Sequence, residues 1–207
     1  MRLHPSFVPA RRPLPLLWRP PLCQLLPLLL PLALVACGGG GGAEATPPAT
    51  AQAAAAGGLS TAHCALPDFQ ASAMARINQK RAAGASCGTR GSFGAATPLA
   101  WSSVLTQAAD GHSRDMAANN FHDHVSADGR TLADRIDATG YAWSTIGENI
   151  AAGYPSVNAV IDGWMASDGH CANLMNPAFT EVGLACMSGN AATTYSSYWT
   201  MTLARPR

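Results

Sequence analysis

The last two thirds of this 207-residue chain are predicted to form an α+β domain. Between residues 67 and 169, four segments carry apolar residues at the spacing of amphipathic helices. From residue 181 onward the pattern changes to two short runs rich in Tyr, Trp and Thr, which favour strands. Because the helices precede a terminal antiparallel pair, we expect helices and sheet to occupy separate layers.

The first two helices have signals at both ends. Residues 67–68 (Pro-Asp) begin the first helix and Gly84 ends it, whereas Ser102 caps the second and residues 119–120 (Asn-Asn) end it. Their buried stripes are expected to be Phe69, Ala73, Ile77 and Arg81, and then Leu105, Ala108, Ala109, His112 and Met116.

Two shorter helices and a hairpin follow. The third helix is expected over 131–139, stopped by Gly140. Ser156 caps a fourth, which residues 168–169 (Asp-Gly) end. After the turn signal at 176–177, strands are expected over 181–187 and 195–204. The apolar positions of the fourth helix are Val157, Val160, Ile161 and Trp164. Local patterns give little evidence of other strands.

The first 36 residues are predicted to be an export signal. They contain four arginines and no acidic residue, and they end in an apolar run over 25–35. This run is shorter than the roughly 20 apolar residues that a membrane span needs, and Pro27 and Pro31 interrupt it. A spanning helix is therefore not expected.

The signal ends in Leu34-Val35-Ala36-Cys37, which resembles a bacterial lipobox. Under this interpretation the mature chain begins with a lipid-bearing Cys37 that anchors it to a membrane. Gly38 is not the aspartate associated with inner-membrane retention, so we expect an envelope lipoprotein of the outer membrane or cell surface. The folded part would lie in the periplasm or the extracellular space. The alternative is an ordinary signal peptide that ends at a chance cysteine.

Residues 37–63 are predicted to be a flexible tether, and the folded domain is expected over 64–207. The tether is rich in Gly, Ala, Thr and Pro, with Glu44 as the single charge between residues 38 and 58. Removal of residues 1–36 leaves nine Lys+Arg and twelve Asp+Glu, a formal net charge of −3. Since no basic patch remains, nucleic-acid binding is not expected.

Four cysteines remain beyond the lipobox, an even number that suits an oxidising compartment: Cys64, Cys87, Cys171 and Cys186. Three pairings can be drawn. Proximity in the sequence favours Cys64 with Cys87 and Cys171 with Cys186. A metal site of cysteines is less favoured because there is no Cys-x-x-Cys pair.

Three polar residues stand at expected element ends, where functional groups often gather: His124 after the second helix, Glu148, and His170 after the fourth helix. Their spacing alone carries no chemistry. The motifs around them are more specific, and they follow one another in order. They are Asn78-x-x-Arg81, His112-Ser113-x-Asp115-Met116-Ala117, Phe121-x-x-His124-x-x-x-Asp128-Gly129, Gly140-Tyr141, Gly147-Glu148-Asn149-Ile150-Ala151-x-Gly153, Trp164-x-x-Ser167-x-Gly169-His170-x-x-Asn173-Leu174 and Phe179-x-Glu181-x-Gly183.

This ordered set resembles the bacterial branch of the CAP superfamily, whose members carry SCP-like extracellular domains. The resemblance implies an α-β-α sandwich with a central antiparallel sheet and an open cleft in which His124, Glu148 and His170 converge. Ser167 and Asn149 belong to the same motifs and are included in the expected cleft. Relatives can hold a divalent metal there, often zinc, and two imidazoles with one carboxylate would suit Zn²⁺.

One position departs from the pattern of many eukaryotic relatives. Where they carry a second glutamate, this chain has Ser167, followed by Asp168. The set of four cleft residues is therefore incomplete. Asp168 is a candidate substitute, although its neighbouring position would point it differently, and a role in the turn at the end of the fourth helix is favoured instead.

Structural roles are the alternatives for these residues. In this alternative, His124 and His170 stabilise loops through hydrogen bonds and bind nothing, and Glu148 is a buried carboxylate held by backbone N–H groups. His112 lies on an apolar stripe and is expected to be a hydrogen-bonded core histidine, whereas His122 is expected to be exposed. Trp164 and Trp199 are expected to pack in the core.

Two catalytic hypotheses are less favoured. Ser167, Asp168 and His170 contain the residue types of a nucleophilic triad, but their proximity in the chain argues against one. A metal-dependent hydrolase with Glu148 as general base lacks the His-Glu-x-x-His motif. We therefore expect a non-enzymatic, envelope-anchored domain whose cleft binds a small apolar or polar-headed ligand, a metal or a protein partner. The alternative function is a peptidase-like hydrolase.

Overall fold

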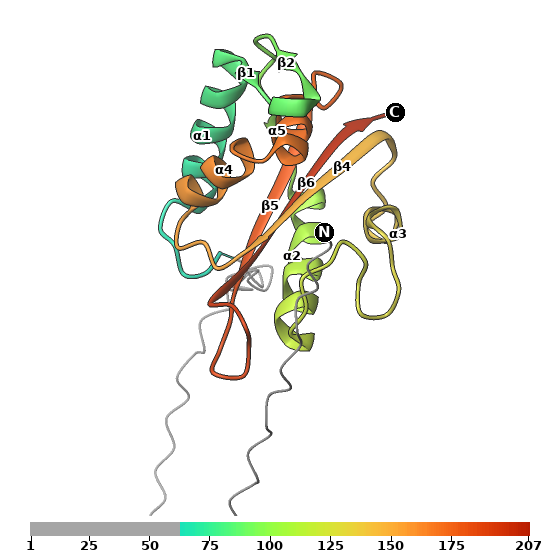
Figure 1. Cartoon of the computed structure of the whole chain (residues 1–207). Coiled ribbons are helices and arrows are strands. Elements are labelled where there is room, and N and C mark those ends of the chain that lie inside the picture. The colour runs from blue at the N-terminus through green and yellow to red at the C-terminus, as the bar shows by residue number, and fades with distance from the viewer. Residues whose placement is uncertain (1–62) are drawn as a thin grey trace, which may run out of the picture. The chain divides into compact units, whose positions relative to one another are not determined.

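A computed structural model describes residues 63–207 of the chain. The expected signal peptide over 1–36, the lipidated Cys37 and the tether up to residue 62 lie outside the described residues. A four-stranded sheet with helices on both faces dominates the described part (Figure 1). None of the helices between residues 63 and 207 has the length and hydropathy that a membrane crossing requires.

The sheet has the strand order β3-β5-β6-β4. The expected hairpin is confirmed: β5 (Glu181–Ser188) pairs antiparallel with β6 (Ser197–Pro206). The third long strand, β4 (Trp143–Ala152), pairs antiparallel with β6 and lies at the edge of the sheet. At the other edge, the two-residue β3 (Ala100–Trp101) runs parallel to β5. The expected antiparallel sheet is thus extended by one short parallel strand.

Four helices confirm the predictions from spacing and caps. They are α1 (Phe69–Ala83), α2 (Ser103–Asn119), α3 (Leu132–Asp137) and α4 (Val157–Met165). Three of them have side-chain caps: the side chains of Ser102, Thr131 and Ser156 accept hydrogen bonds from the first-turn N–H groups of α2, α3 and α4. Local sequence signals therefore locate these helices well.

The prediction that residues 168–169 only break the fourth helix was wrong, because α4 already ends at Met165. After a break of two residues, a further helix, α5 (Asp168–Met175), begins there. A small two-stranded sheet also forms before α2, from β1 (Ala85–Ser86) and β2 (Ser92–Phe93). Between its strands lies the short 3₁₀ helix η1 (Gly88–Arg90), which contacts α5.

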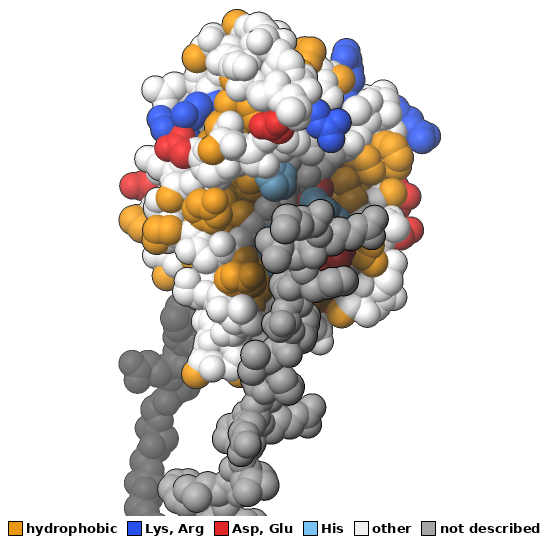
Figure 2. Space-filling view, viewed as in Figure 1, with side chains coloured by type: hydrophobic (Ala, Val, Ile, Leu, Met, Phe, Trp, Pro, Cys, Tyr) orange, Lys and Arg blue, Asp and Glu red, His pale blue; other side chains and the backbone are white. Residues whose placement is uncertain are grey.

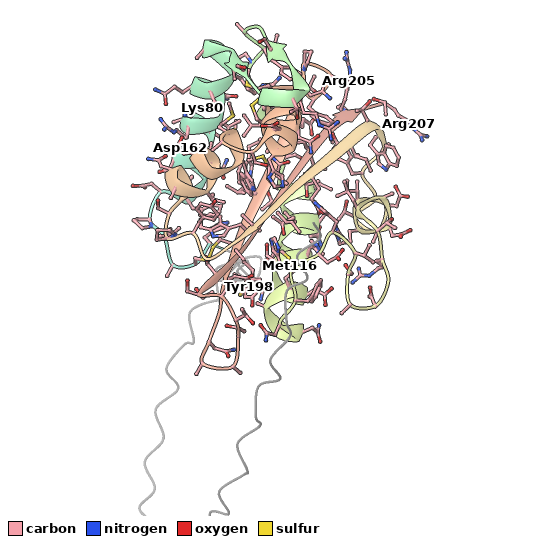
Figure 3. All side chains as sticks on the ribbon, viewed as in Figure 1. Lys80, Met116, Asp162, Tyr198, Arg205 and Arg207 are labelled. Carbon is pink, nitrogen blue, oxygen red and sulfur yellow. A yellow bond between two sulfur atoms is a disulfide. The ribbon has the colours of Figure 1, made fainter. Side chains whose placement is uncertain are left out.

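The core lies on both faces of the sheet, as the alternation of side chains along β6 requires. Trp199, Met201 and Leu203 pack with α1, α4 and α5, whereas Tyr198 packs with Met116 of α2 on the opposite face. Figure 3 labels Met116 and Tyr198 where they meet. The predicted core positions of Trp164 and Trp199 are confirmed, since both are almost completely buried. These layers form the expected α-β-α sandwich.

A glycine sets the distance between the sheet and α2. A Cβ added at Gly183 of β5 would overlap the backbone of Leu105 and Thr106 in the first turn of α2. Only a residue without a side chain lets the helix approach the strand this closely.

On the other face, α4 is fastened to α1 by a charge cluster. Asp162 of α4 accepts hydrogen bonds from Arg76 at 2.6 Å and from Lys80 at 2.8 Å, both on α1. Asp162 and Lys80 face one another in Figure 3. The pKa of Asp162 is lowered, first by the hydrogen bond from Arg76 and then by that from Lys80. Because Asp162 is partly exposed, this cluster adds little stability and mainly sets how the two helices lie.

The pairing of cysteines that sequence proximity favoured was wrong. The disulfides join Cys64 to Cys186 and Cys87 to Cys171. The first ties the segment before α1 to β5, where His63 forms a β-bridge with Cys186. The second ties η1 to α5. The paired cysteines are 122 and 84 residues apart in the sequence. Which of them meet depends on tertiary contacts, which proximity in the sequence does not reveal.

Candidate functional site

A buried ion pair forms the base of the site. Glu148 lies within β4 rather than at an element end, and the alternation of the strand places it between Ile146 and Ile150 on the face toward α2. Its Oε2 accepts a hydrogen bond at 2.6 Å from Arg135 of α3, and both side chains are only 3% exposed. The guanidinium therefore compensates the charge of the carboxylate inside the protein.

The same arginine positions the loop that carries His124. Arg135 also donates hydrogen bonds to the backbone oxygens of His124 and Arg130 and to the hydroxyl of Ser126. The loop between α2 and α3 is thereby held against β4. This explains how a residue outside regular structure can reach Glu148.

His124 and Glu148 meet, as expected. Nδ1 of His124 lies 2.8 Å from Oε1 of Glu148. A carboxylate can only accept, so Nδ1 carries the proton and Nε2 is the ring nitrogen left for a ligand. The hydrogen bond that His124 donates to the Glu148 carboxylate raises the pKa of His124 above 6.5, against the opposing effect of partial burial. Since the His124 side chain is 56% exposed, it forms the outer end of this chain of bonds.

His170 comes from the opposite side of β4. It lies in the first turn of α5 rather than in a loop, and its backbone oxygen accepts a hydrogen bond from Asn149 at 3.0 Å. Asn173 donates to the backbone oxygen of Glu148 and to the side-chain oxygen of Asn149, both at 3.1 Å. Asn149, included in the expected cleft, is fully buried and holds α5 against β4.

The free edge of β4 is covered by side chains. The carbonyls of Glu148 and Ile150 accept hydrogen bonds from Asn173 at 3.1 Å and from Trp164 at 3.0 Å. An uncovered edge strand would be a template for pairing with another chain. Here α4 and α5 cap that edge and present their own residues beside it.

Two cavities adjoin at His170. The first, which we name the histidine cavity, has a volume of about 390 Å³ and is lined by His124, Glu148, His170, Arg90 and Asn173, among others. The second, which we name the aromatic cavity, has a volume of about 300 Å³. Its lining includes His170 together with His122, Tyr154, Trp164, Ser167 and Tyr195. Together we call them the cleft; in Figure 2, pale blue histidine side chains lie in the middle of the face, with hydrophobic ones on either side.

His170 and His122 are less basic than an ordinary histidine. Burial is the main cause that lowers the pKa of His170, and the nearby His124 and His122 lower it further. Burial is also the main cause that lowers the pKa of His122. As expected, His122 is exposed, but it also lines the aromatic cavity, where its ring contacts that of Tyr195 edge-on. At neutral pH, His170 is therefore an uncharged donor and acceptor between the two cavities.

Asp168 does not take part in the cleft. Its carboxylate accepts hydrogen bonds from the backbone N–H and the hydroxyl of Thr89, at 2.8 and 2.6 Å. These bonds lower its pKa. The role favoured for Asp168, in the turn that ends the fourth helix, was wrong, because Asp168 is the first residue of α5. Facing Thr89, it neither replaces the missing glutamate nor orients His170, so Ser167, Asp168 and His170 do not form a triad.

The donor set does not fit a zinc site with three protein ligands. Both oxygens of Glu148 are engaged, by Arg135 and by His124. Among residues 63–207, no group of three or more His, Cys, Asp and Glu side chains could hold a metal ion. The chain offers two imidazoles, those of His124 and His170, and zinc binding stays a prediction.

His112 has the structural role that its position on the apolar stripe predicted. It is fully buried, and its Nε2 donates to the backbone oxygen of Asp123 at 2.9 Å, so its Nδ1 faces the hydroxyl of Ser126 as an acceptor. Burial is the main cause that lowers its pKa.

Sequence reasoning missed Arg135, Arg90, Tyr154 and Tyr195. Arg135 had one signal, since it is an arginine at the centre of a short helix that otherwise needs an apolar face. The other three reach the cleft through tertiary structure: Arg90 through the disulfide next to η1, Tyr154 through the turn after β4, and Tyr195 through the loop between β5 and β6. Nothing local in the sequence indicates such contacts.

Comparison with known proteins identifies the domain. The family model described as "CAP: Cysteine-rich secretory protein family" matches residues 74–203. Two proteins of Bacillus subtilis (strain 168) are each 37% identical: the uncharacterized membrane protein YlbC over 86 residues and the uncharacterized protein YkwD over 87 residues. Each match covers 42% of this chain, but only 25% of YlbC and 34% of YkwD.

Solved structures show similar partial matches. An extracellular protein containing a SCP domain from Bacillus anthracis is 34% identical with a TM-score of 0.47, and the match covers 53% of this chain and 34% of that one. An outer surface protein from Borrelia burgdorferi is 19% identical with a TM-score of 0.49, over 54% of this chain and 80% of that one.

Proposed function

The chain belongs to the CAP family, the cysteine-rich secretory protein family, and on that premise we propose that it is an exported binding protein whose cleft takes a small amphipathic ligand. The observation that carries this proposal is the position of His170, which lines both the histidine cavity and the aromatic cavity. One ligand in contact with His170 can therefore reach a polar cavity with one end and an aromatic cavity with the other.

The size and lining of the cleft support a small molecule. Cavities of about 300 and 390 Å³ fall at the lower end of the range for small-molecule sites, which is roughly 300–1,000 Å³. Tyr154, Trp164 and Tyr195 offer apolar surface on one side of His170. On the other side, Nε2 of His124 and the side-chain oxygen of Asn173 offer polar atoms that fix orientation.

The arrangement gives little support to a metal-dependent hydrolase. A general base must have a carboxylate oxygen free to take a proton. In Glu148 one oxygen is held by Arg135 and the other by His124, inside the protein. Glu148 therefore acts as a positioning residue that orients His124, which suits binding better than proton transfer.

Export is supported by the two disulfides, which persist in oxidising compartments and are rare in the cytosol. We further propose that lipid attachment at Cys37 holds the protein in the cell envelope, with the domain outside the cytosol. A Cys37→Ser variant should lose its association with the membrane, which tests this anchor. If the variant stays at the membrane, the anchor proposal fails but the binding proposal for the cleft does not.

The binding proposal is tested by what the full-length protein retains on purification. Mass spectrometry of extracted small molecules should find an amphipathic compound in wild-type protein and much less in a His170→Ala variant. His63→Ala is the control, because His63 stacks on Phe69 away from both cavities. The proposal would be overturned if neither the wild-type protein nor the His170→Ala variant retained an amphipathic compound.

A further inference from the structure

An arginine whose guanidinium has no hydrogen-bond partner among residues 63–207 lines the histidine cavity. Arg90 is the last residue of η1, is exposed, and borders the cavity beside His124 and His170. Within the described residues its guanidinium makes no hydrogen bond or salt bridge. By contrast, Arg135, which pairs with the cavity residue Glu148, donates through both Nη atoms to Glu148 and to the loop.

The position of Arg90 is fixed by three ties between η1 and the start of α5. The Cys87–Cys171 disulfide joins the two elements directly. Thr89 donates two hydrogen bonds to Asp168. Gly88 lies so close to the Asp168 carboxylate that a Cβ would overlap it, and its φ of +54° also favours glycine. These ties hold η1, and with it the backbone of Arg90, against the start of α5, where His170 lies.

The charges around Arg90 leave it available for a ligand. Glu148, the carboxylate inside the cavity, is already paired with Arg135. Asp168, the carboxylate nearest to η1, is turned toward Thr89, and Arg90 acts on it only through space. Among the described residues that line the histidine cavity, the charged group without a hydrogen-bonded counter-charge is thus the Arg90 guanidinium, a group that binds carboxylates and phosphates in a bidentate manner.

We infer that the histidine cavity selects an anionic head group, a carboxylate or a phosphate, through Arg90, and that the Cys87–Cys171 disulfide holds Arg90 in place. This inference rests on the proposed binding function and names the chemical class of its ligand. The apolar part of the ligand then lies in the aromatic cavity, with His170 at the junction.

Water-soluble probes with one tail and different heads test the inference. Ligand-observed NMR titrations of the full chain in phosphatidylcholine nanodiscs would compare hexyl phosphate and hexanoate with neutral 1-hexanol, and with inorganic phosphate alone. Wild-type protein should bind the two anionic probes about tenfold more tightly than 1-hexanol. Arg90→Gln should remove most of this preference: the affinity for the anionic probes should fall roughly fivefold, as expected for loss of a partly exposed charge pair.

Matched variants separate selection from folding. Arg130→Gln should leave the preference unchanged, because Arg130 is exposed and paired with Asp128 away from the cavity. A Cys87→Ala/Cys171→Ala variant that still melts cooperatively should lose the preference as Arg90→Gln does. Retention of the preference in Arg90→Gln would overturn the role of Arg90, and retention in the cysteine variant would overturn the role of the disulfide.

The probes also distinguish failure of this inference from failure of the proposed function. If 1-hexanol and hexyl phosphate bind equally and His170→Ala weakens both, the cleft binds amphiphiles but Arg90 does not select their charge. If no amphiphile binds to wild-type protein, both proposals fall. If inorganic phosphate alone binds as tightly as hexyl phosphate, the site takes a free anion and the amphipathic ligand is wrong.

Discussion

Arg135 and Glu148 form an ion pair with a separation of 2.6 Å, and the side chains of both are 3% exposed. This pair links three parts of the chain, since Arg135 lies on α3, Glu148 on β4, and the remaining bonds of both residues reach the His124 loop. The geometry of the cleft therefore depends on this buried contact.

Removal of one partner should be strongly destabilising. Arg135→Met leaves the Glu148 carboxylate buried without its counter-charge, and we expect a loss of about 3–5 kcal/mol in the free energy of unfolding. Urea denaturation followed by circular dichroism measures it. The Arg135→Met/Glu148→Met double variant should recover part of the loss, because no isolated charge remains. A single variant as stable as the wild type would contradict the buried pair.

Acid should weaken the fold through His112. Its pKa in the folded protein lies below the ordinary 6.5, so its contribution to stability is fully present above pH 6.5 and is lost as the pH falls through the lowered value. The stability difference between wild type and His112→Gln should therefore shrink between pH 7.5 and pH 5. Urea unfolding of both proteins across this range checks the sign. A difference that grows on acidification would show a raised pKa instead.

The disulfide connectivity can be read directly. Non-reducing proteolysis and mass spectrometry should recover peptides that join Cys64 to Cys186 and Cys87 to Cys171. Loss of the first bridge in Cys64→Ala/Cys186→Ala should reduce stability by about 3–5 kcal/mol, because it closes the longer loop. Peptides that join Cys64 to Cys87 would contradict the arrangement of the layers.

A glycine in α4 should prove necessary for the aromatic cavity. A Cβ at Gly163 would overlap the ring of Tyr154, whereas a Cβ at Gly111 in α2 would meet nothing within 4 Å. Gly111→Ala should stabilise the protein by up to about 1 kcal/mol through helix propensity. Gly163→Ala should show no such gain and should weaken hexanol binding. Equal thermal stabilisation by the two substitutions would place Tyr154 elsewhere.

Zinc uptake should depend on the two imidazoles. Because both oxygens of Glu148 are occupied, calorimetric titration should show at most weak binding, which His124→Ala and His170→Ala each abolish. A tight site with one zinc per chain that survives either substitution would show that other residues bind the metal.

The sequence predicted the elements whose signals are local. Caps at Ser102, Thr131 and Ser156 and the apolar spacing located four helices, and alternation located the hairpin. The strand β4 escaped because Glu148 and Asn149 replace apolar residues at its centre, and because the partners of these two residues, Thr202 and Met201, lie more than fifty residues away. The helix α5 escaped because a short segment that contains Gly169 is weakly helical until contacts with η1 and β4 hold it.

The site was predictable only in part for the same reason. His124, Glu148 and His170 could be singled out from ordered motifs, and the first two are in direct contact. The positioning of Arg90 and the occupation of Glu148 by Arg135 depend on tertiary contacts, which spacing does not encode. The disulfide pairing likewise follows from which layers meet.

The most direct test of the account is whether one ligand occupies both cavities. NMR titration of hexyl phosphate into protein with labelled histidine and tyrosine should shift the ring signals of His124, His170 and Tyr195 together, with a single dissociation constant. Signals from only one cavity, or two sets that titrate with different constants, would contradict a shared amphipathic site joined at His170.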